Sequence, residues 1–316
     1  MNLKSPILAA PLLPPESTHT DDEIFAAMKQ CKYPVGVTLK KDGIRGIRAN
    51  GTLLSRSLKK IPNKSIRDAA LIMPGGFDME LWNQDLEYHQ IESIVMSAEH
   101  PDSDHIQFHV LDWMGPATEG FGYAERCRLI GSWMNQAAND VWKDTVPRVK
   151  FAPPLVCHNA EQLFAFYKAV VQECGEGVCF RTLDSRYKQG RSTLKEQCLV
   201  KLAPFIFEEA RVVAIEEQME NGNTEKHNAT GKMDRSSFAG NKQGKNTLGV
   251  LIGEDIKTSQ LVRCGTGLGL TKVLRQHIWN NFDQYKGKMF TYKHKPHGKK
   301  NLPRSPIFHG WRKEGY

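Results

Sequence analysis

The stretch at residues 38–46 reads TLKKDGIRG. The residues on either side, 34–39 and 44–49, each predict a β-strand, so the charged stretch between them forms a turn or strand end. It carries two adjacent ammonium groups, Lys40 and Lys41, followed at once by a carboxylate and a guanidinium. A solvated surface turn tolerates such charges, and so does an active site in which a lysine attacks phosphorus. The rest of the chain has to decide between these two interpretations.

Further elements around this turn predict an α+β first domain. The pair Asn50-Gly51 is a hairpin signal that joins the strand at 44–49 to the next strand. The clearest helix begins after the capping residue Asn159 and ends at Gly175. The expected helices span residues 21–31 and 159–174, and the expected strands span residues 34–39, 44–49, 52–56, 77–82, 106–114 and 176–181.

The pattern changes after residue 204, where a series of short strands begins. Five strands and one helix fit a small barrel of the kind that binds nucleic acid on its face. Residues 218–247 are rich in Asn, Gly, Lys and Ser, lack apolar periodicity, and are expected to form a mobile loop. The expected strands span residues 211–215, 249–252, 261–264, 288–293 and 306–310, and the expected helix spans residues 271–285.

Length and charge agree with two domains, at residues 1–204 and 205–316. A chain of 316 residues is longer than one core usually fills. Residues 1–204 hold 24 Lys+Arg and 24 Asp+Glu, whereas residues 205–316 hold 19 and 11, so the second domain carries the entire net charge of +8. This asymmetry predicts that the second domain contacts a polyanion. A solvated basic tail is the other interpretation of the same charge.

Composition excludes several classes of protein. No apolar run is long enough to span a bilayer, and the proline-interrupted segment PILAAPLLPP does not read as a secretory signal. The 7 cysteines are odd in number and lack paired CxxC spacing. They are therefore expected to be free thiols in a reducing cytoplasm, and no membrane partner is expected. His105 and His109 lie near aspartates, but their spacing fits no tetrahedral metal site.

A few charged residues stand on otherwise apolar strands. Lys40 ends a strand, Asp78 and Glu80 face one side of theirs, Glu176 begins another, and Lys201 lies in the apolar run LVKLA. Each alone is explained by a surface ion pair or by a lysine that reaches out of the core edge. Together they offer a nucleophilic amine, carboxylates for a divalent cation and cations for phosphate.

The order of short motifs resembles that of covalent nucleotidyltransferases, a group that includes ATP-dependent DNA ligases, RNA ligases and mRNA capping enzymes. Residues 40–45, KKDGIR, are similar to the KxDGxR signature of this group. Its companions follow in the expected order, and the ending at residues 294–312 resembles the close of small phage-type DNA ligases. The companion motifs are Ser55-Arg56, Asp78-Met79-Glu80 with Met in place of Gly, EGVCFR at 176–181 and YKQGRST at 187–193.

The resemblance implies a two-domain fold of class α+β, in which a nucleotidyltransferase (adenylation) domain precedes a C-terminal OB-fold β-barrel. It also implies an ATP-dependent DNA ligase that acts on nicked double-stranded DNA as a monomer, with Lys40 as the nucleophile that attacks the α-phosphate of ATP. Mg²⁺ is the expected ion, held by Glu80 and Glu176. The residues implied to bind the nucleotide are Leu39, Arg45, Glu80, Leu111, Glu176 and Lys201.

The DNA contacts implied by the resemblance are basic. Arg56 is expected to grip the 5′-phosphate of the nick, and Arg191 is expected to act near it, because guanidinium forks onto phosphate oxygens. The C-terminal residues are expected to clamp the duplex backbone without reading its sequence. These residues are Lys288, Lys293, Lys295, Lys299, Lys300, Arg304 and Arg312.

Three positions depart from the pattern of the group. Thr38 stands where an acid often reads the adenine, and Leu111 stands where an aromatic residue usually precedes the aspartate, unless Phe108 or another ring substitutes. Ala203 stands where a second lysine usually follows Lys201. Two alternatives therefore stay open: an RNA ligase with the same lysine chemistry, and a non-catalytic nick-binding protein with a degenerate nucleotide site.

Overall fold

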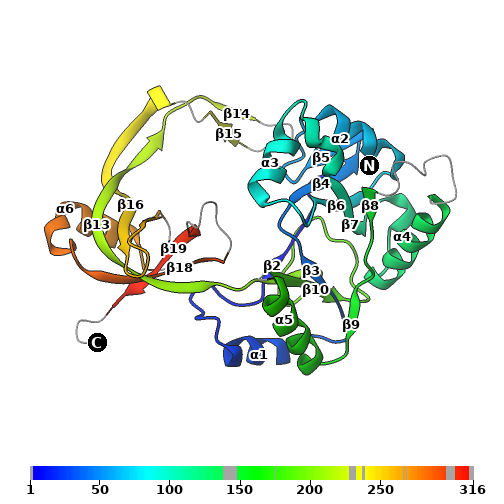
Figure 1. Ribbon diagram of the computed structural model, residues 1–316, viewed down its shortest axis with the longest axis horizontal. Helices are drawn as coiled ribbons and strands as arrows, with labels where there is room; N and C mark the ends of the chain where they lie inside the picture. Colours follow the sequence, from blue (N-terminus) through cyan, green and yellow to red (C-terminus); the bar gives the residue numbers. More distant parts are fainter. Residues whose placement is uncertain are drawn as a thin grey trace. The chain divides into compact units, whose positions relative to one another are not determined.

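The chain forms two compact units in the computed structural model (Figure 1). The first unit contains residues 1–13 and 20–203, and the second contains residues 14–19 and 204–316. The domain boundary predicted at residue 204 stays a prediction, to which the structure adds that the segment 14–19 groups with the second unit. The structure describes residues 3–137, 148–174, 176–227, 233–236, 239–265, 267, 269–296 and 303–312.

One sheet of the first unit carries Lys40. Two helices, α1 and α5, pack on one face of this sheet, and their apolar side chains form a common core with its strands. Thr20 caps α1 and Asn159 caps α5, because each side chain accepts a hydrogen bond from a backbone N–H of the first turn. The sheet has the order β2 (Ala10–Pro11), β12 (Val200–Leu202), β10 (Gly177–Thr182), β3 (Val35–Lys40) and β9 (Leu155–Cys157), and the helices are α1 (Asp21–Lys29) and α5 (Ala160–Cys174).

A second sheet of the same unit has its own core. Apolar residues of β6 and β7 pack beneath helices α2, α3 and α4. Asn50 and Gly51 both have positive φ, as the predicted hairpin between β4 and β5 requires. The order is β5 (Thr52–Ser55), β4 (Ile44–Ala49), β6 (Phe77–Trp82), β7 (Gln107–Trp113) and β8 (Val149–Lys150), and the helices are α2 (Lys64–Ala69), α3 (Tyr88–Met96) and α4 (Tyr123–Ala137).

Short elements complete the first unit. Strand β1 (Ile7–Leu8) pairs in parallel with β11 (Gly190–Arg191). Single 3-10 turns connect several of the larger elements: η1 (Ala70–Ile72), η2 (Pro101–His105) and η3 (Pro116–Thr118). Among the described residues, no helix combines the length and the apolar character needed to cross a membrane.

The chain passes from the first sheet to the second through the turn at 41–43. Gly43 lies against the neighbouring strand, since a Cβ atom there would stand 2.3 Å from the Leu81 carbonyl oxygen. Only glycine fits so close a backbone approach. The KKDG sequence therefore places Lys40 on one sheet and Arg45 on the next.

The second unit is an antiparallel sheet with one main helix. Helix α6 (Lys272–Asn280) begins at the capping residue Thr271 and packs on β16, and the short turn η6 (Phe282–Gln284) follows it. An isolated bridge joins Gly267 to Phe308. The strand order is β17 (Leu261–Cys264), β16 (Lys242–Asp255), β13 (Ile206–Asn221), β18 (Met289–Lys295) and β19 (Arg304–Trp311).

The prediction of a mobile loop at 218–247 is wrong for most of the described residues of this segment. Strands β13 and β16 continue into this region as a paired ribbon, which Figure 1 shows as a long curved extension of both strands, and which we call the arm (residues 216–221 and 242–248). Two short strands, β14 (Glu225–His227) and β15 (Met233–Arg235), and the turn η5 (Ala239–Asn241) follow between its strands. Polar side chains stabilise the arm: Glu217 accepts a hydrogen bond from the Asn246 N–H at 2.7 Å. Such a ribbon buries little apolar surface, so its sequence has no apolar periodicity.

Candidate active site

Lys40 lies at the end of β3 with its amine directed at a carboxylate. Its Nζ is 3.4 Å from Oε2 of Glu176, and both side chains are partly buried. The pairing follows from register, because Lys40 is opposite Gly177 in the β3–β10 ladder. A Cβ atom at Gly177 would lie 2.0 Å from the Leu202 carbonyl oxygen, so glycine is needed for strands β10 and β12 to meet here.

Lys41 has a different environment from Lys40. Its Nζ lies 4.2 Å from the centroid of the Trp82 ring, in a cation–π contact. The two adjacent lysines therefore serve different surroundings: one amine faces a carboxylate at the sheet edge, and the other packs on an indole.

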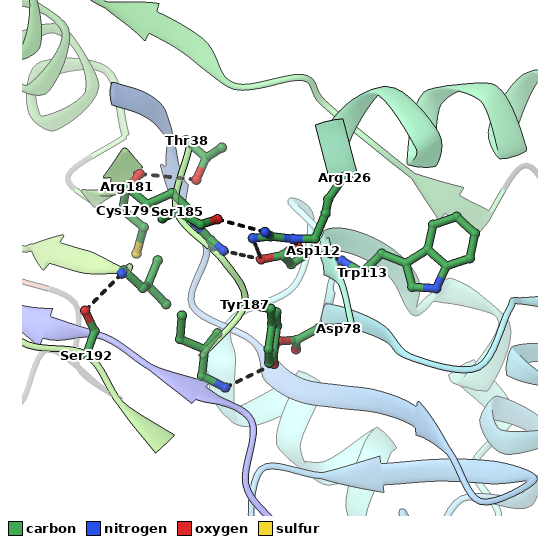
Figure 2. A network of polar contacts seen from close by, with 12 residues as sticks. Thr38, Asp78, Asp112, Trp113, Arg126, Cys179, Arg181, Ser185, Tyr187 and Ser192 are labelled. Carbon is green, nitrogen blue, oxygen red and sulfur yellow. Dashed lines mark hydrogen bonds and ion pairs between the residues drawn. The ribbon is translucent and has the colours of Figure 1, made fainter. Parts of the chain in front are cut away.

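Arg45 is fixed by a buried carboxylate on the neighbouring strand. Its Nε and Nη2 atoms form a forked ion pair with the two oxygens of Asp78, a residue with 0% exposure. The Tyr187 hydroxyl donates a further hydrogen bond of 2.6 Å to Asp78 Oδ2 (Figure 2). The guanidinium plane of Arg45 is thus set by a fully buried carboxylate, which the Tyr187 hydroxyl in turn holds.

A second buried carboxylate, Asp112, lies opposite Asp78 across β6 and β7. Arg126 from α4 binds both of its oxygens at 2.6 and 2.9 Å, and Arg181 from β10 binds Oδ2 as well (Figure 2). Arg126 also donates to the carbonyl oxygens of Phe121 and Ser185, each at 2.8 Å. The network ties both sheets, α4 and the segment after β10 together behind the site.

Glu80 is a predicted site residue whose pKa is shifted by burial. Burial raises its pKa to about 7, although the charges of Arg45 and Lys40 act in the opposite direction. The Gly43 N–H donates a hydrogen bond to Glu80, so this carboxylate also holds the turn that follows Lys40.

The predicted phosphate-binding cations gather on the same unit. Partial burial lowers the pKa of Lys201, and three neighbouring cations lower it further: Lys40, Arg191 and Arg56. Lys201 lies opposite Cys179 in the β10–β12 ladder, one strand away from β3. Arg56 and Arg191 are exposed, and Nη1 of Arg191 donates to the Ala9 carbonyl oxygen at 3.1 Å. Lys40, Arg56 and Arg191 therefore all lie within electrostatic reach of Lys201, and we call these four residues the cationic cluster.

The predicted apolar contacts to the nucleotide are placed less favourably. Leu39 is 42% exposed, and the alternation along β3 directs it to the face opposite Thr38 and Lys40, which leaves only its backbone for a ligand on the Lys40 face. Leu111 is the extra residue of a β-bulge and is partly buried. Phe108 is buried in the core, so it does not supply the missing ring.

The predicted DNA contacts of the second unit divide into three groups. Lys288 and Arg312 are exposed, and Lys295 and Arg304, which are paired across β18 and β19, are partly exposed. Lys299 and Lys300 lie outside the described residues. Lys293 is only 5% exposed, so little of its side chain is available to a duplex backbone, and its predicted contact stays a prediction. Its Nζ donates to the Pro15 carbonyl oxygen at 2.5 Å and lies 5.2 Å from the Phe205 ring centroid.

Replacing Lys293 with methionine is expected to destabilise the protein. The variant keeps the apolar stem but leaves the Pro15 carbonyl without this charged donor, which costs about 1–3 kcal/mol of the free energy of unfolding. Urea unfolding followed by circular dichroism measures this difference. Lys288→Met removes an exposed ammonium from the same strand region and should change stability little; equal stabilities of the two variants would contradict the buried role.

The sequence prediction missed Arg126 and the contacts that several of the motif residues make with one another. Arg126 had a detectable signal, since it lies on the apolar stripe of α4 with Tyr123, Cys127 and Ile130. Asp78, Asp112, Arg181 and Tyr187 lie inside or beside the motifs already noted, but nothing in the spacing shows that they bind one another.

Taken together, these features define the class of fold: a mixed α/β domain followed by an OB-like domain, an arrangement similar to the fold of ATP-dependent DNA ligases. Residues 239–312 match the family described as the DNA ligase OB-like domain. None of the curated proteins matches the chain.

Two solved structures illustrate the likeness. The DNA ligase-adenylate of Chlorella virus is 24% identical, with 98% of this chain and 100% of that chain covered and a TM-score of 0.51. A Lig E DNA ligase is 21% identical, with 88% of this chain and 92% of that chain covered and a TM-score of 0.64. At these identities the likeness establishes the fold.

Proposed function

We propose that this protein is an ATP-dependent DNA ligase that seals nicks in duplex DNA through a lysyl-AMP intermediate. The observation that carries the proposal is the position of Lys40, whose amine lies at a strand end 3.4 Å from Glu176 and within the cationic cluster of Lys201, Arg56 and Arg191. A nucleophile beside phosphate-binding cations is what phosphoryl transfer needs.

The chemistry proceeds in three transfers. The neutral Lys40 amine attacks the α-phosphorus of ATP, an N–P bond forms, the P–O bond to pyrophosphate breaks, and the amine loses a proton. The 5′-phosphate of the nick then displaces Lys40 from the adenylate. Finally the 3′-hydroxyl attacks this activated phosphate, AMP leaves, and the strand is joined.

The residues around Lys40 take distinct roles in this scheme. Lys201 holds the α-phosphate, and Arg45 contacts the adenylate with a guanidinium whose plane Asp78 fixes. Arg56 and Arg191 are exposed and bind phosphates near the nick. Lys288, Lys295, Arg304 and Arg312 contact the duplex backbone.

The carboxylates fit a Mg²⁺ ion that is bound mainly through its substrate. Among the described residues, no group of three or more His, Cys, Asp or Glu is placed to hold a metal ion by itself. Mg²⁺ commonly binds one or two carboxylates plus substrate phosphates, and Glu176 and Glu80 would supply them. Bound there, the ion would neutralise phosphate charge.

The structure also gives an observation that favours the non-catalytic alternative. Ala203 replaces a lysine, and it packs so closely that a Cβ atom at Gly177 would lie 2.6 Å from the Ala203 Cα. An alanine side chain carries no charge, so position 203 supplies no phosphate-binding cation. A nick-binding protein without adenylation chemistry is the second candidate.

Labelled ATP separates these candidates. Incubation of the protein with Mg²⁺ and ATP labelled at the α-phosphate should give an acid-labile protein adduct, which disappears when nicked DNA is added and is replaced by sealed product. Nick binding without any adduct supports the non-catalytic candidate. Faster sealing of an RNA nick than of a DNA nick supports an RNA ligase instead.

The rate of adduct formation is expected to rise as the pH increases through about 7, because Glu80 acts as an ionised ligand and burial raises its pKa to that value. Glu80→Gln keeps the shape but stays neutral. We expect it to react roughly 10²-fold more slowly than wild type at pH 8.5 and to approach the wild-type rate near pH 5.5. Deprotonation of Lys40 affects both proteins, so the ratio of their rates isolates Glu80.

Stability should respond to pH in the opposite sense. A carboxyl group whose pKa is raised in the folded state stabilises the fold fully below its unfolded pKa of about 4.3, and this contribution is lost as the pH rises through about 7. Glu80→Gln should therefore melt at a higher temperature than wild type at pH 8.5 and at nearly the same temperature at pH 4.5. The role of Glu80 in the reaction would be contradicted if the ratio of the adduct-formation rates of Glu80→Gln and wild type stayed constant between pH 5.5 and pH 8.5. Glu92→Gln, on the surface of α3, is the control variant.

A further inference from the structure

Tyr187 joins two parts of the first unit that are far apart in sequence. Its hydroxyl donates to Asp78 Oδ2 at 2.6 Å and accepts a hydrogen bond of 3.0 Å from the Ile7 N–H (Figure 2). A phenolic hydroxyl has one hydrogen to donate and few positions at which it can accept a hydrogen bond. One donated bond and one accepted bond therefore fix the orientation of the phenol. Burial raises the pKa of Tyr187 well above its ordinary value, so the hydroxyl keeps its proton and remains a donor.

Asp78 transmits this constraint to Arg45. The carboxylate is 0% exposed, and its partners are the Arg45 guanidinium and the Tyr187 hydroxyl. Arg45 uses Nε and Nη2 for this pair, which leaves Nη1 as the guanidinium nitrogen that Asp78 does not engage. Because the fork is planar, the direction of Nη1 depends on the orientation of Asp78, and hence on the bond from Tyr187.

The segment that carries Tyr187 is itself held by the N-terminal strand. Gly190 donates to the Pro6 carbonyl oxygen at 3.1 Å, and the Gln189 side chain accepts from the Lys4 N–H at 2.7 Å. Arg191, whose guanidinium belongs to the cationic cluster, follows directly. The chain of bonds from Ile7 through Tyr187 and Asp78 therefore connects the segment of Arg191 with the strand of Arg45.

We propose that Tyr187 is a positioning residue of the reaction. Through Asp78 it orients the Arg45 guanidinium toward the adenylate, and it holds Arg45 in a fixed position relative to the nick-binding segment at 187–191. This inference rests on the proposed ligase function. It assigns Tyr187 no contact with a reacting atom, and it predicts an effect on rate rather than on nick affinity.

The test is Tyr187→Phe, which removes only the hydroxyl. At saturating ATP, single-turnover formation of the lysyl-AMP adduct should slow about tenfold, the loss of one hydrogen bond to a charged group, while the Kd for nicked DNA changes less than twofold. Tyr167→Phe removes the hydroxyl of a buried tyrosine on α5, outside this network, and should react at the wild-type rate.

A double-variant cycle separates positioning from stability. If Tyr187 acts through Arg45, its replacement should cost nothing further in an Arg45→Lys background, where the fork to Asp78 is already lost. Equal tenfold losses in both backgrounds, or a wild-type rate for Tyr187→Phe with only a lowered Tm, would overturn the inference.

If Tyr187→Phe does not fold, Tyr187→His keeps a donor for Asp78: a rate within threefold of wild type supports the inference, and a rate at or below that of Arg45→Lys contradicts it. The proposed function fails separately, if wild-type protein forms no adduct.

Discussion

Replacing Lys40 with alanine is expected to abolish both the ATP-dependent protein adduct and the sealing of nicked DNA. Removal of a covalent nucleophile lowers rates on the order of 10⁴–10⁶-fold, because no other group can form the intermediate. Lys40 meets the geometric requirement for that role, because it is the last residue of β3 and its amine lies beside Glu176. The amine also interacts electrostatically with Lys201. The measurement is gel detection of label from the α-phosphate of ATP, followed by single-turnover sealing.

The neighbouring lysine provides the control for this prediction. Lys41→Ala removes the same charge one residue away, and the amine that it removes packs on the Trp82 ring. It should retain the adduct. A protein that is labelled equally in both variants would place the adduct elsewhere, and a wild-type protein that binds nicks but never forms an adduct would be a binding module.

A further consequence concerns substrates that are already activated. A nick that carries a preformed 5′-adenylate does not need the Lys40 adduct, so Lys40→Ala should still join it while Arg56→Ala should not. This difference separates loss of the nucleophile from loss of the site as a whole. Failure of Lys40→Ala on the activated nick, with normal nick binding, would show that Lys40 also contributes to the last transfer.

Much of the first unit could be predicted because its strands obey simple alternation. The expected strands at 34–39, 44–49 and 77–82 agree with β3, β4 and β6 to within one residue at either end. In β6 the apolar residues Phe77, Met79 and Leu81 face the core, which leaves Asp78 and Glu80 on the opposite face. The charged residues on these strands could be identified because an alternating pattern assigns each residue to one face of the sheet.

Alternation fails where the strand is irregular, and Asp112 is the example. Phe108 and Val110 face the core, so regular alternation would place Asp112 there too. The bulge at Leu111 adds one residue, and Asp112 pairs with Asp78 on the site face instead. A bulge depends on both strands of a pair, so one strand's sequence does not reveal it.

Long-range contacts limited the other predictions. The hydrogen bond between Lys293 and Pro15 joins residues 278 positions apart, and a basic residue in a basic segment gives no sign of such burial. The arm is similar: Met219 and Glu220 pair with Gly244 and Gln243, and this pairing leaves no apolar pattern in either strand. What the sequence lacks in both cases is the identity of the partner.

Asp112→Asn is expected to be among the most destabilising substitutions that keep the shape of a side chain. Asp112 is 0% exposed and binds two arginines, of which Arg126 is also 0% exposed. The asparagine leaves these cations buried without their counter-charge, which costs about 3–5 kcal/mol when one partner of a buried ion pair is removed. Urea unfolding should show a lower midpoint with an unchanged m-value. Asp104→Asn, whose carboxylate is 82% exposed and pairs with Arg148, removes an ion pair of the same type at the surface and should change the midpoint little.

Because Arg126 also holds the Ser185 carbonyl, the buried variant should in addition loosen the segment that leads to Tyr187, and limited proteolysis would then cut near 185–189 in Asp112→Asn but not in Asp104→Asn. Equal midpoints for the two variants would show that the buried arginines find other partners, and the network would then be a consequence of the fold and not a condition for it.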